Sequence, residues 1–284
     1  MTDDESFEVA VCQYGFGGVE TADELCARAR ALFDRAGAAD CYVLPELFAN
    51  DLTLDETGEP GALPAAAEAT LTAFVADAAV RRDAVVVGGS YLTRDDGTLY
   101  NRLPIGLPDG SVRTYDKCRP IPSEREQGTA PGSAAAPVVE HRGVAVGALV
   151  CYDVEFPDLV RDVADRGAEL LVVPSLTADE GGFQRVARCC AARAVENQQY
   201  VVQVPLVGTH PRGEKTGTGR GTVYAPCDEV VGPEGTGLTL ARDRHTAATQ
   251  SLDVAALRAS RTDAAVPPYT DSKRFEAMDD AYAP

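Results

Sequence analysis

The chain has 284 residues, 45% of them hydrophobic, and a formal net charge of −18 at pH 7. This length suits one large domain or two small ones, and it is enough to bury a sizeable core. The acidic excess argues against a nucleic-acid partner, which needs clustered lysine and arginine, and no apolar run is long enough to span a bilayer.

Apolar, β-branched runs alternate with amphipathic or alanine-rich segments, which predicts a mixed sheet with helices packed outside it. In chain order we expect a strand at residues 7–14, a helix at 21–36, a strand at 41–44, a helix at 63–82, strands at 84–91, 100–107, 112–117 and 144–150, a helix at 156–166, a strand at 170–173, a helix at 183–197, and strands at 200–207, 221–224, 229–231 and 246–252. The turn signature Pro108-Asp109-Gly110 joins two of these strands into a hairpin.

The composition also bears on the cellular setting. The acidic first residues lack the basic start and apolar stretch of a signal peptide, so we expect the protein in the cytoplasm. Only three of the 26 basic residues are lysines, and an acidic, lysine-poor chain resembles proteins of halophilic organisms, in which salt screens self-repulsion. An ordinary acidic cytosolic protein is the alternative. The eight cysteines form no C-x-x-C pair, which argues against zinc and thioredoxin-like sites.

Cys151 stands where the apolar run 144–150 ends and polar residues begin. A thiol at such an edge is within reach of a substrate, as a cysteine nucleophile must be. Glu46 and Lys117 also follow apolar strands, and strand ends are where ligands gather in α/β sheets. A carboxylate in an apolar pocket can take the proton of a thiol, and an ammonium can stabilise an oxyanion. The three side chains could therefore perform acyl transfer without histidine.

Four motifs in order resemble those of the nitrilase superfamily, the carbon–nitrogen hydrolases. They are Leu44-Pro45-Glu46-Leu47-Phe48, Tyr115-Asp116-Lys117, Cys151-Tyr152-Asp153-Val154-Glu155-Phe156-Pro157 and Arg193-Ala194-Val195-Glu196-Asn197. The resemblance implies an α/β fold, a four-layer α-β-β-α sandwich, with a hydrolase domain at 1–263 and a C-terminal tail at 264–284 that packs on its own or a neighbouring subunit. It also implies a homodimer or higher homo-oligomer, and no metal or organic cofactor.

The resemblance assigns a role to each member of the triad. Glu46 would be the general base and then the acid, Cys151 would attack the carbonyl carbon, and Lys117 would hold the developing negative charge. The backbone N–H of Tyr152 would be a second oxyanion donor. The family often has another glutamate after the lysine. The first choice for this residue is Glu126 and the second is Glu124. The alternative is that both are solvated loop carboxylates with no role in the site.

Three features depart from the usual family pattern or refine it. Cys118-Arg119-Pro120 replaces a His-Leu-Pro-like stretch, and we expect Cys118 to be a local packing residue. Glu155 stands where many relatives carry a basic residue. We expect Glu155 to face solvent, with selection for a cationic substrate as the alternative. Tyr152-Asp153 resembles the amidase and carbamoylase branches, which predicts a small-molecule amide or N-carbamoyl substrate rather than a nitrile.

Two other functions stay open. One is a cysteine hydrolase assisted by a histidine, for which the candidates are His141, His210 and His245. The other is a catalytically silent binding protein of the same fold.

Overall fold

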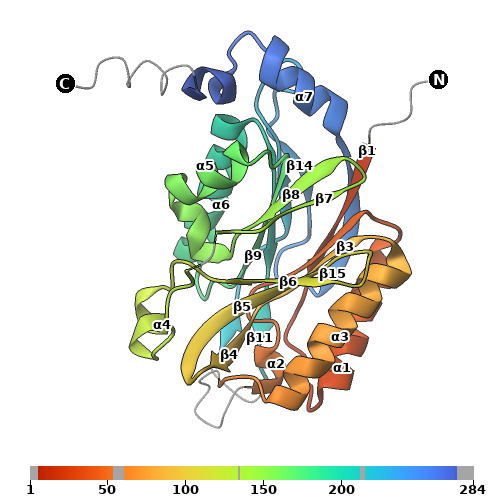
Figure 1. Cartoon of the computed structure of the whole chain (residues 1–284), viewed down its shortest axis with the longest axis vertical. Coiled ribbons are helices and arrows are strands. Elements are labelled where there is room, and N and C mark those ends of the chain that lie inside the picture. Colours follow the sequence, from red (N-terminus) through yellow and green to blue (C-terminus); the bar gives the residue numbers. More distant parts are fainter. Residues whose placement is uncertain (1–5, 54–60, 134, 212–214, 274–284) are drawn as a thin grey trace.

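The computed structural model describes residues 6–53, 61–133, 135–211 and 215–273, and two large sheets packed face to face dominate it (Figure 1). The first sheet has the order β15 (Thr246–Asp253), β1 (Ser6–Gln13), β2 (Cys41–Leu44), β3 (Val85–Gly88), β5 (Thr98–Gly106) and β4 (Tyr91–Asp95), and β6 (Val112–Asp116) pairs with β5 off this path. The second has the order β14 (Thr236–Thr239), β13 (Thr222–Tyr224), β10 (Tyr200–Pro205), β9 (Leu170–Ser175), β8 (Val144–Ala148) and β7 (Val138–His141).

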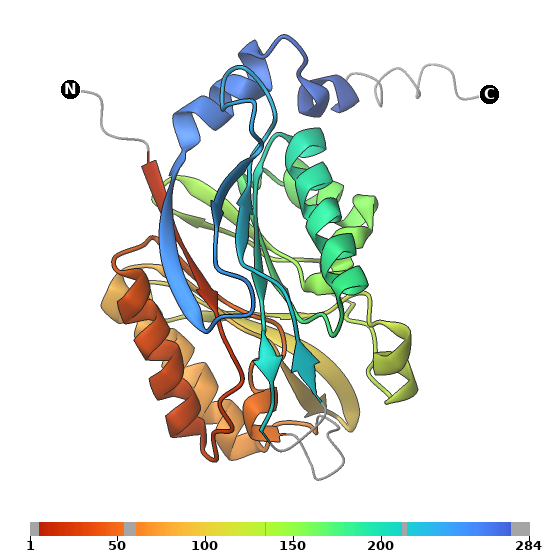
Figure 2. The ribbon, with the colours of Figure 1, turned by 180° about the vertical axis from the view of Figure 1, so that it is seen from behind.

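Helices cover the outer faces of both sheets (Figure 2). Those on the first sheet are α1 (Ala22–Ala36) and α3 (Ala65–Arg82), and those on the second are α5 (Pro157–Asp165) and α6 (Glu180–Asn197). The other helices are α2 (Asn50–Thr53), α4 (Pro122–Glu126), the 3₁₀ helix η1 (Cys151–Glu155) and α7 (Val254–Asp263). A two-stranded ribbon, β11 (Gly208–Thr209) with β12 (Thr216–Gly217), completes the fold. The predicted α/β four-layer architecture is confirmed. No helix among the described residues is long and apolar enough to cross a membrane.

Alternating side chains of the first sheet enter two different cores. Val9 and Val11 of β1 face the second sheet, whereas Ala10 and Cys12 face the layer of α1 and α3. Successive strand residues point to opposite faces, and both faces of this sheet are covered, so its strands read as continuous apolar runs rather than as alternating ones. This explains why residues 41–44 are entirely buried.

Helix ends follow local capping rules. The Thr21 side chain accepts the N–H of Glu24 at the start of α1, and Asp179 accepts the N–H of Gly182 at the start of α6. Both place a short polar side chain where backbone donors would otherwise lack partners. α6 thereby begins directly after the strand β9 and the loop that lines the functional site.

Two predicted elements differ in the structure. Residues 229–231 form a turn rather than a strand, because Asp228 accepts the N–H groups of Val230 and Val231 and bends the chain. The strand expected at 84–91 divides into β3 and β4 at Gly89, whose φ of 71° lies in the left-handed region that glycine adopts without strain.

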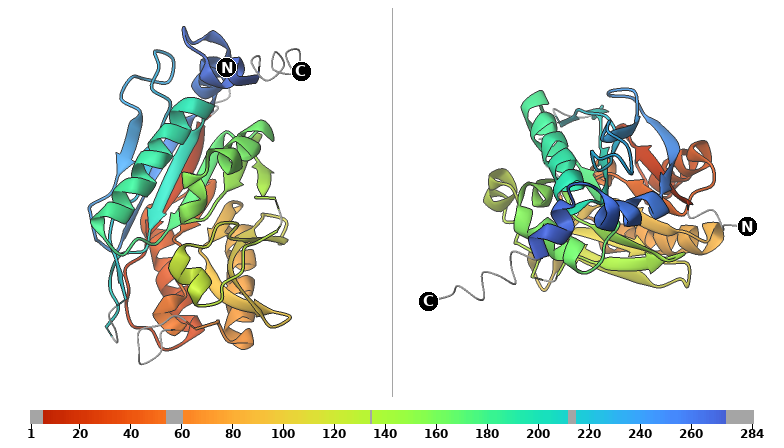
Figure 3. Two further views of the ribbon diagram at one scale, coloured as in Figure 1. Left: turned by 90° about the vertical axis from the view of Figure 1, so that its left-hand side faces the viewer. Right: turned by 90° about the horizontal axis from the view of Figure 1, so that it is seen from above.

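The chain end packs on its own domain as far as it is described. The hydroxyl of Tyr269 donates to the carbonyl of Ala164, and the Tyr269 N–H donates to the Gln198 side chain. α7 and these residues lie at the end of the molecule where β1 begins (Figure 3). The remainder of the expected tail, residues 274–284, lies outside the described residues, and the predicted domain boundary at residue 263 stays a prediction.

Candidate active site

Glu46 lies just beyond the end of β2 and is 2% exposed. Its Oε1 accepts from Lys117 Nζ at 2.7 Å and from Asn101 Nδ2 at 3.1 Å, and its Oε2 accepts the Leu176 N–H at 2.8 Å. Burial raises the pKa of Glu46, Lys117 opposes that shift, and the charge of Glu124 adds to it. The result is a carboxylate with an enhanced affinity for a proton, fixed in place through both oxygens.

Lys117 follows β6 and is the most deeply buried cation of the site, 1% exposed. Its Nζ contacts Glu46 and also both oxygens of Glu124, at 3.0 and 2.9 Å. Burial alone would lower the pKa of Lys117, but the two carboxylates raise it above its usual value. The ammonium therefore stays charged in a pocket that excludes most water.

Glu124, rather than the first choice Glu126, is the second carboxylate at this position. Glu124 is buried in α4, and its Oε2 also accepts the Ile121 N–H at the start of that helix. Glu126 is exposed to solvent. Two residues apart on a helix point about 200° apart, so only one of the two can face Lys117.

Cys151 begins η1, directly beyond β8, and its backbone φ of 48° lies in the left-handed region. A non-glycine residue rarely adopts this conformation, and such strained backbone is concentrated at functional sites. The Sγ atom lies 3.7 Å from the Leu176 carbonyl oxygen. Burial raises the pKa of the Cys151 thiol well above its usual value, Glu46 raises it further through its charge, and Lys117 lowers it. These effects favour the protonated thiol over the thiolate at this position.

Asp153 holds the turn that carries Cys151, and the sequence reasoning did not assign it this position. Its Oδ2 accepts from the Tyr115 hydroxyl at 2.9 Å and from the Val150 N–H at 3.2 Å, and its Oδ1 accepts the Arg119 N–H at 2.7 Å. These contacts tie the turn that carries Cys151 to the segment that carries Lys117. The signal in the sequence was an acidic residue only two positions after Cys151, directly beyond an apolar run.

Asn101 is the other polar residue that the sequence reasoning missed. It is fully buried in β5 and donates to both Glu46 and Glu124. The available signal was an asparagine at an inward-facing position between Leu99 and Leu103 of the strand, because a buried amide needs partners.

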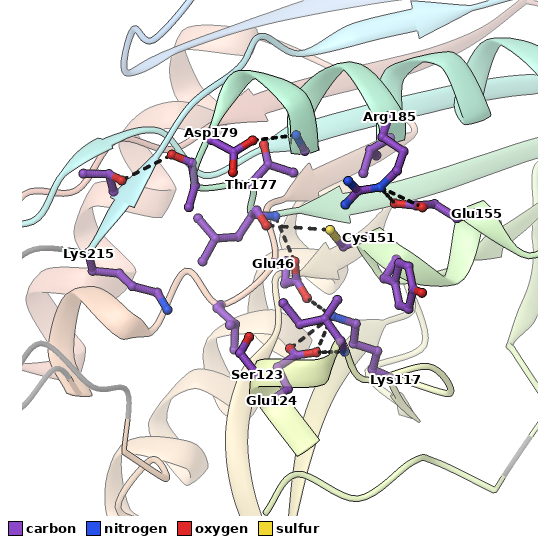
Figure 4. A pocket seen from close by; sticks show the side chains of 18 of the residues that line it. Glu46, Lys117, Ser123, Glu124, Cys151, Glu155, Thr177, Asp179, Arg185 and Lys215 are labelled. Carbon is purple, nitrogen blue, oxygen red and sulfur yellow. Dashed lines mark hydrogen bonds and ion pairs between the residues drawn. The ribbon is translucent and has the colours of Figure 1, made fainter. Parts of the chain in front are cut away.

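The three triad residues open onto one cavity of about 310 Å³ (Figure 4). The lining also includes Tyr152, directly after Cys151, and Glu155. Glu155 does not simply face solvent: its side chain is 13% exposed and is paired with Arg185. Cys118 is half-buried and packs beside the core between the sheets.

None of the three histidines lines this cavity. His210 contacts Asp51, His245 accepts the Gly15 N–H, and His141 lies in the edge strand β7. Among the described residues, no group of three or more His, Cys, Asp or Glu side chains is arranged to hold a metal ion.

The sequence model of the carbon–nitrogen hydrolase family matches residues 8–239 of this chain. An (R)-stereoselective amidase of Pseudomonas sp is 32% identical over 249 residues, which cover 86% of this chain and 84% of that protein. A 2-oxoglutaramate amidase of Paenarthrobacter nicotinovorans is 29% identical over 240 residues, 78% of this chain and 80% of that protein. The probable hydrolase YhcX of Bacillus subtilis is 30% identical over 233 residues, 78% of this chain, and the match spans 45% of its length.

Solved structures show the same fold at low sequence identity. A carbon–nitrogen hydrolase from Helicobacter pylori G27 superposes with a TM-score of 0.77 at 19% identity, covering 98% of each chain. Nit3 of Saccharomyces cerevisiae, described as a member of branch 10 of the nitrilase superfamily, superposes with a TM-score of 0.73 at 20% identity, covering 90% of this chain and 93% of that one.

Proposed function

Because the chain belongs to the carbon–nitrogen hydrolase family, within the nitrilase superfamily, we propose that it hydrolyses a small-molecule amide or N-carbamoyl compound through a thioester on Cys151. The single observation that carries the proposal is the buried contact of Glu46 with Lys117 beside Cys151, at the wall of one cavity. The relatives named as amidases favour an amide over a carbamoyl compound.

The first half-reaction forms the acyl-enzyme. Glu46 takes the proton of the Cys151 thiol as the sulfur attacks the carbonyl carbon, and the carbonyl π electrons move to the oxygen. The oxyanion is stabilised by the charge of Lys117 and by the Tyr152 N–H. When the carbon–nitrogen bond breaks, Glu46 returns the proton to the leaving nitrogen, and ammonia or an amine departs.

The second half-reaction hydrolyses the thioester. Glu46 removes a proton from water, the hydroxide oxygen attacks the thioester carbon, and a second oxyanion forms at the same place. The carbon–sulfur bond then breaks, Cys151 regains its proton from Glu46, and a carboxylic acid is released. Lys117 contacts both Glu46 and Glu124, so each protonation of Glu46 removes one negative charge from the surroundings of the ammonium.

Purified protein tests the proposal with a panel of amides and ammonia release as the readout. Cys151→Ala, Glu46→Gln and Lys117→Ala should each reduce turnover by at least about a thousandfold, because residues of such a set act as one unit. Mass spectrometry of the wild type should show an acyl adduct on Cys151. The exposed Cys227, which lies outside the cavity, supplies the control variant Cys227→Ala.

The alternatives make different predictions. A histidine-assisted hydrolase would lose activity in a variant of His141, His210 or His245 while Glu46→Gln retained it. A silent binding protein would release no ammonia across the panel, and Cys151 would not react with alkylating agents.

A further inference from the structure

The acidic side chains that line the cavity near Cys151 already accept hydrogen bonds from other groups of the protein. Both oxygens of Glu46 and both oxygens of Glu124 accept hydrogen bonds from the protein. Farther out, Asp179 accepts the Gly182 N–H at the start of α6. These groups are therefore poor partners for a positively charged substrate, although four of the lining residues are acidic.

The wall formed by α6, in contrast, presents hydrogen-bond donors that have no partner among the residues that the structure describes. Arg185 donates through Nε alone to both oxygens of Glu155, at 2.8 and 2.9 Å. This contact occupies Glu155 and fixes the plane of the guanidinium. Within the described part of the chain, the terminal nitrogens Nη1 and Nη2 of Arg185 have no hydrogen bond, and the side chain is 57% exposed at the cavity. Two parallel N–H donors held in one orientation match the two oxygens of a carboxylate.

Lys215 supplies a second positive charge on the cavity wall away from Arg185 (Figure 4). It follows the ribbon strand β11 and precedes β12, and among the described residues it has no ion pair. Lys117, the third cation of the cavity, is fully engaged with Glu46 and Glu124. Available donors thus remain on Arg185 and Lys215, while most of the carboxylate oxygens are occupied.

We propose that the substrate is an amide whose acyl portion ends in a carboxylate, recognised by the terminal nitrogens of Arg185 while the amide carbon lies at Cys151. This inference rests on the proposed amide hydrolysis and specifies its substrate class. Glu155 acts as a positioning residue for Arg185. The net charge of −18 repels anions at a distance, so the preference for a carboxylate depends on Arg185 at short range, and Lys215 adds positive potential from the far wall of the cavity (Figure 4).

Three amides of similar length test this recognition: the monoamide of glutaric acid, neutral pentanamide and cationic 5-aminopentanamide, all at one ionic strength. The wild type should have a kcat/KM for the carboxylate amide at least about tenfold above that for the other two. Arg185→Met should lower that value by roughly 10- to 100-fold, because charged hydrogen bonds are lost. Lys215→Met, on the far wall of the cavity, should lower it by a smaller factor. Turnover of pentanamide should stay within about twofold.

Arg188→Met is the matched control, since it removes the same charge from the same helix. Arg188 is exposed and lines a different groove, so its variant should leave all three amides unaffected. A general effect of net charge would instead appear in Arg185→Met and Arg188→Met alike, and would overturn the assignment.

A binding measurement separates this inference from the proposed function. Cys151→Ala should bind glutarate in calorimetry, and the affinity should fall in Cys151→Ala/Arg185→Met. If glutarate does not bind, or if the wild type prefers pentanamide or 5-aminopentanamide, the carboxylate assignment is wrong. The proposed amide hydrolysis is unaffected by either result. Arginine-dependent glutarate binding together with no ammonia release and no acyl adduct supports the recognition site and contradicts the hydrolase mechanism.

Discussion

Lys117 donates to both carboxylate oxygens of Glu124, with Nζ at 3.0 and 2.9 Å from them. Because the same ammonium also contacts Glu46, two buried carboxylates share one cation. One negative charge is left uncompensated, and together with burial it raises the pKa of Glu46 despite the opposing effect of Lys117. In the proposed mechanism Glu124 thereby makes Glu46 a stronger base toward the thiol of Cys151.

Replacing Glu124 by glutamine should therefore weaken catalysis while preserving much of the hydrogen bonding. We expect kcat to fall roughly 10- to 100-fold, since the base loses proton affinity, and the acid limb of the pH profile to move to lower pH. Glu126→Gln, on the same short helix but exposed, should stay within about twofold of the wild type. Equal losses in the two variants would contradict the assignment of Glu124.

Replacing Asp153 by asparagine should misplace the nucleophile. Both Asp153 oxygens accept hydrogen bonds, so the amide of asparagine would present a donor where an acceptor is needed. We expect kcat to fall about a hundredfold and stability to fall by about 1–3 kcal/mol. Tyr115→Phe removes one contact and should cost less in both measurements. The rate of alkylation of Cys151 at fixed pH reports the position of the thiol, and a normal rate in Asp153→Asn would refute the positioning role.

The pH dependence of kcat/KM should follow Glu46 rather than the thiol. Burial raises the pKa of Glu46 above its ordinary value near 4.5, and only the ionised carboxylate can accept a proton, so activity should rise with pH through a limb above 4.5. The thiol pKa is raised well above 9.0, so no second rise should occur near pH 9. A rise at that pH would instead indicate a preformed thiolate as the nucleophile.

His245 should make stability depend on pH on the acidic side. Burial, together with the charges of Arg28 and Arg35, lowers the pKa of His245 from 6.5 to about 4. Its neutral Nδ1 accepts the Gly15 N–H at 3.0 Å. Because the folded pKa lies below the unfolded one, the stabilising contribution is present above pH 6.5 and is lost as the pH falls toward 4.

His245→Asn should flatten the fall in melting temperature between pH 6.5 and 4. An unchanged slope in that variant would assign the acid sensitivity to other groups.

The net charge of −18 predicts stabilisation by salt. Screening of self-repulsion should raise the melting temperature by several degrees between low and molar KCl. Differential scanning calorimetry measures this directly. A melting temperature that does not change with KCl would contradict the resemblance to halophilic proteins.

The sequence by itself predicted the order of most strands and helices and proposed Glu46, Lys117 and Cys151 as the candidate triad. For Glu46 and Cys151 the signal was local, since an apolar strand that ends at a polar side chain is visible within about ten residues; β6, which precedes Lys117, is mostly polar, and there the resemblance to the family motif supplied the signal. The turn at 229–231 was missed because its hydrogen bonds come from one aspartate rather than from the hydropathy pattern.

Only the tertiary structure decided which further side chains join the triad. Glu124 and Glu126 have the same chemistry in the sequence, and the phase of a short helix, fixed by its packing beside Lys117, selects one of them. Asp153 and Arg119 come together across 34 residues, and Arg185 and Glu155 across 30. Such pairs depend on how the layers pack, because a side chain's partner is set by distance in space, which the local sequence pattern does not encode.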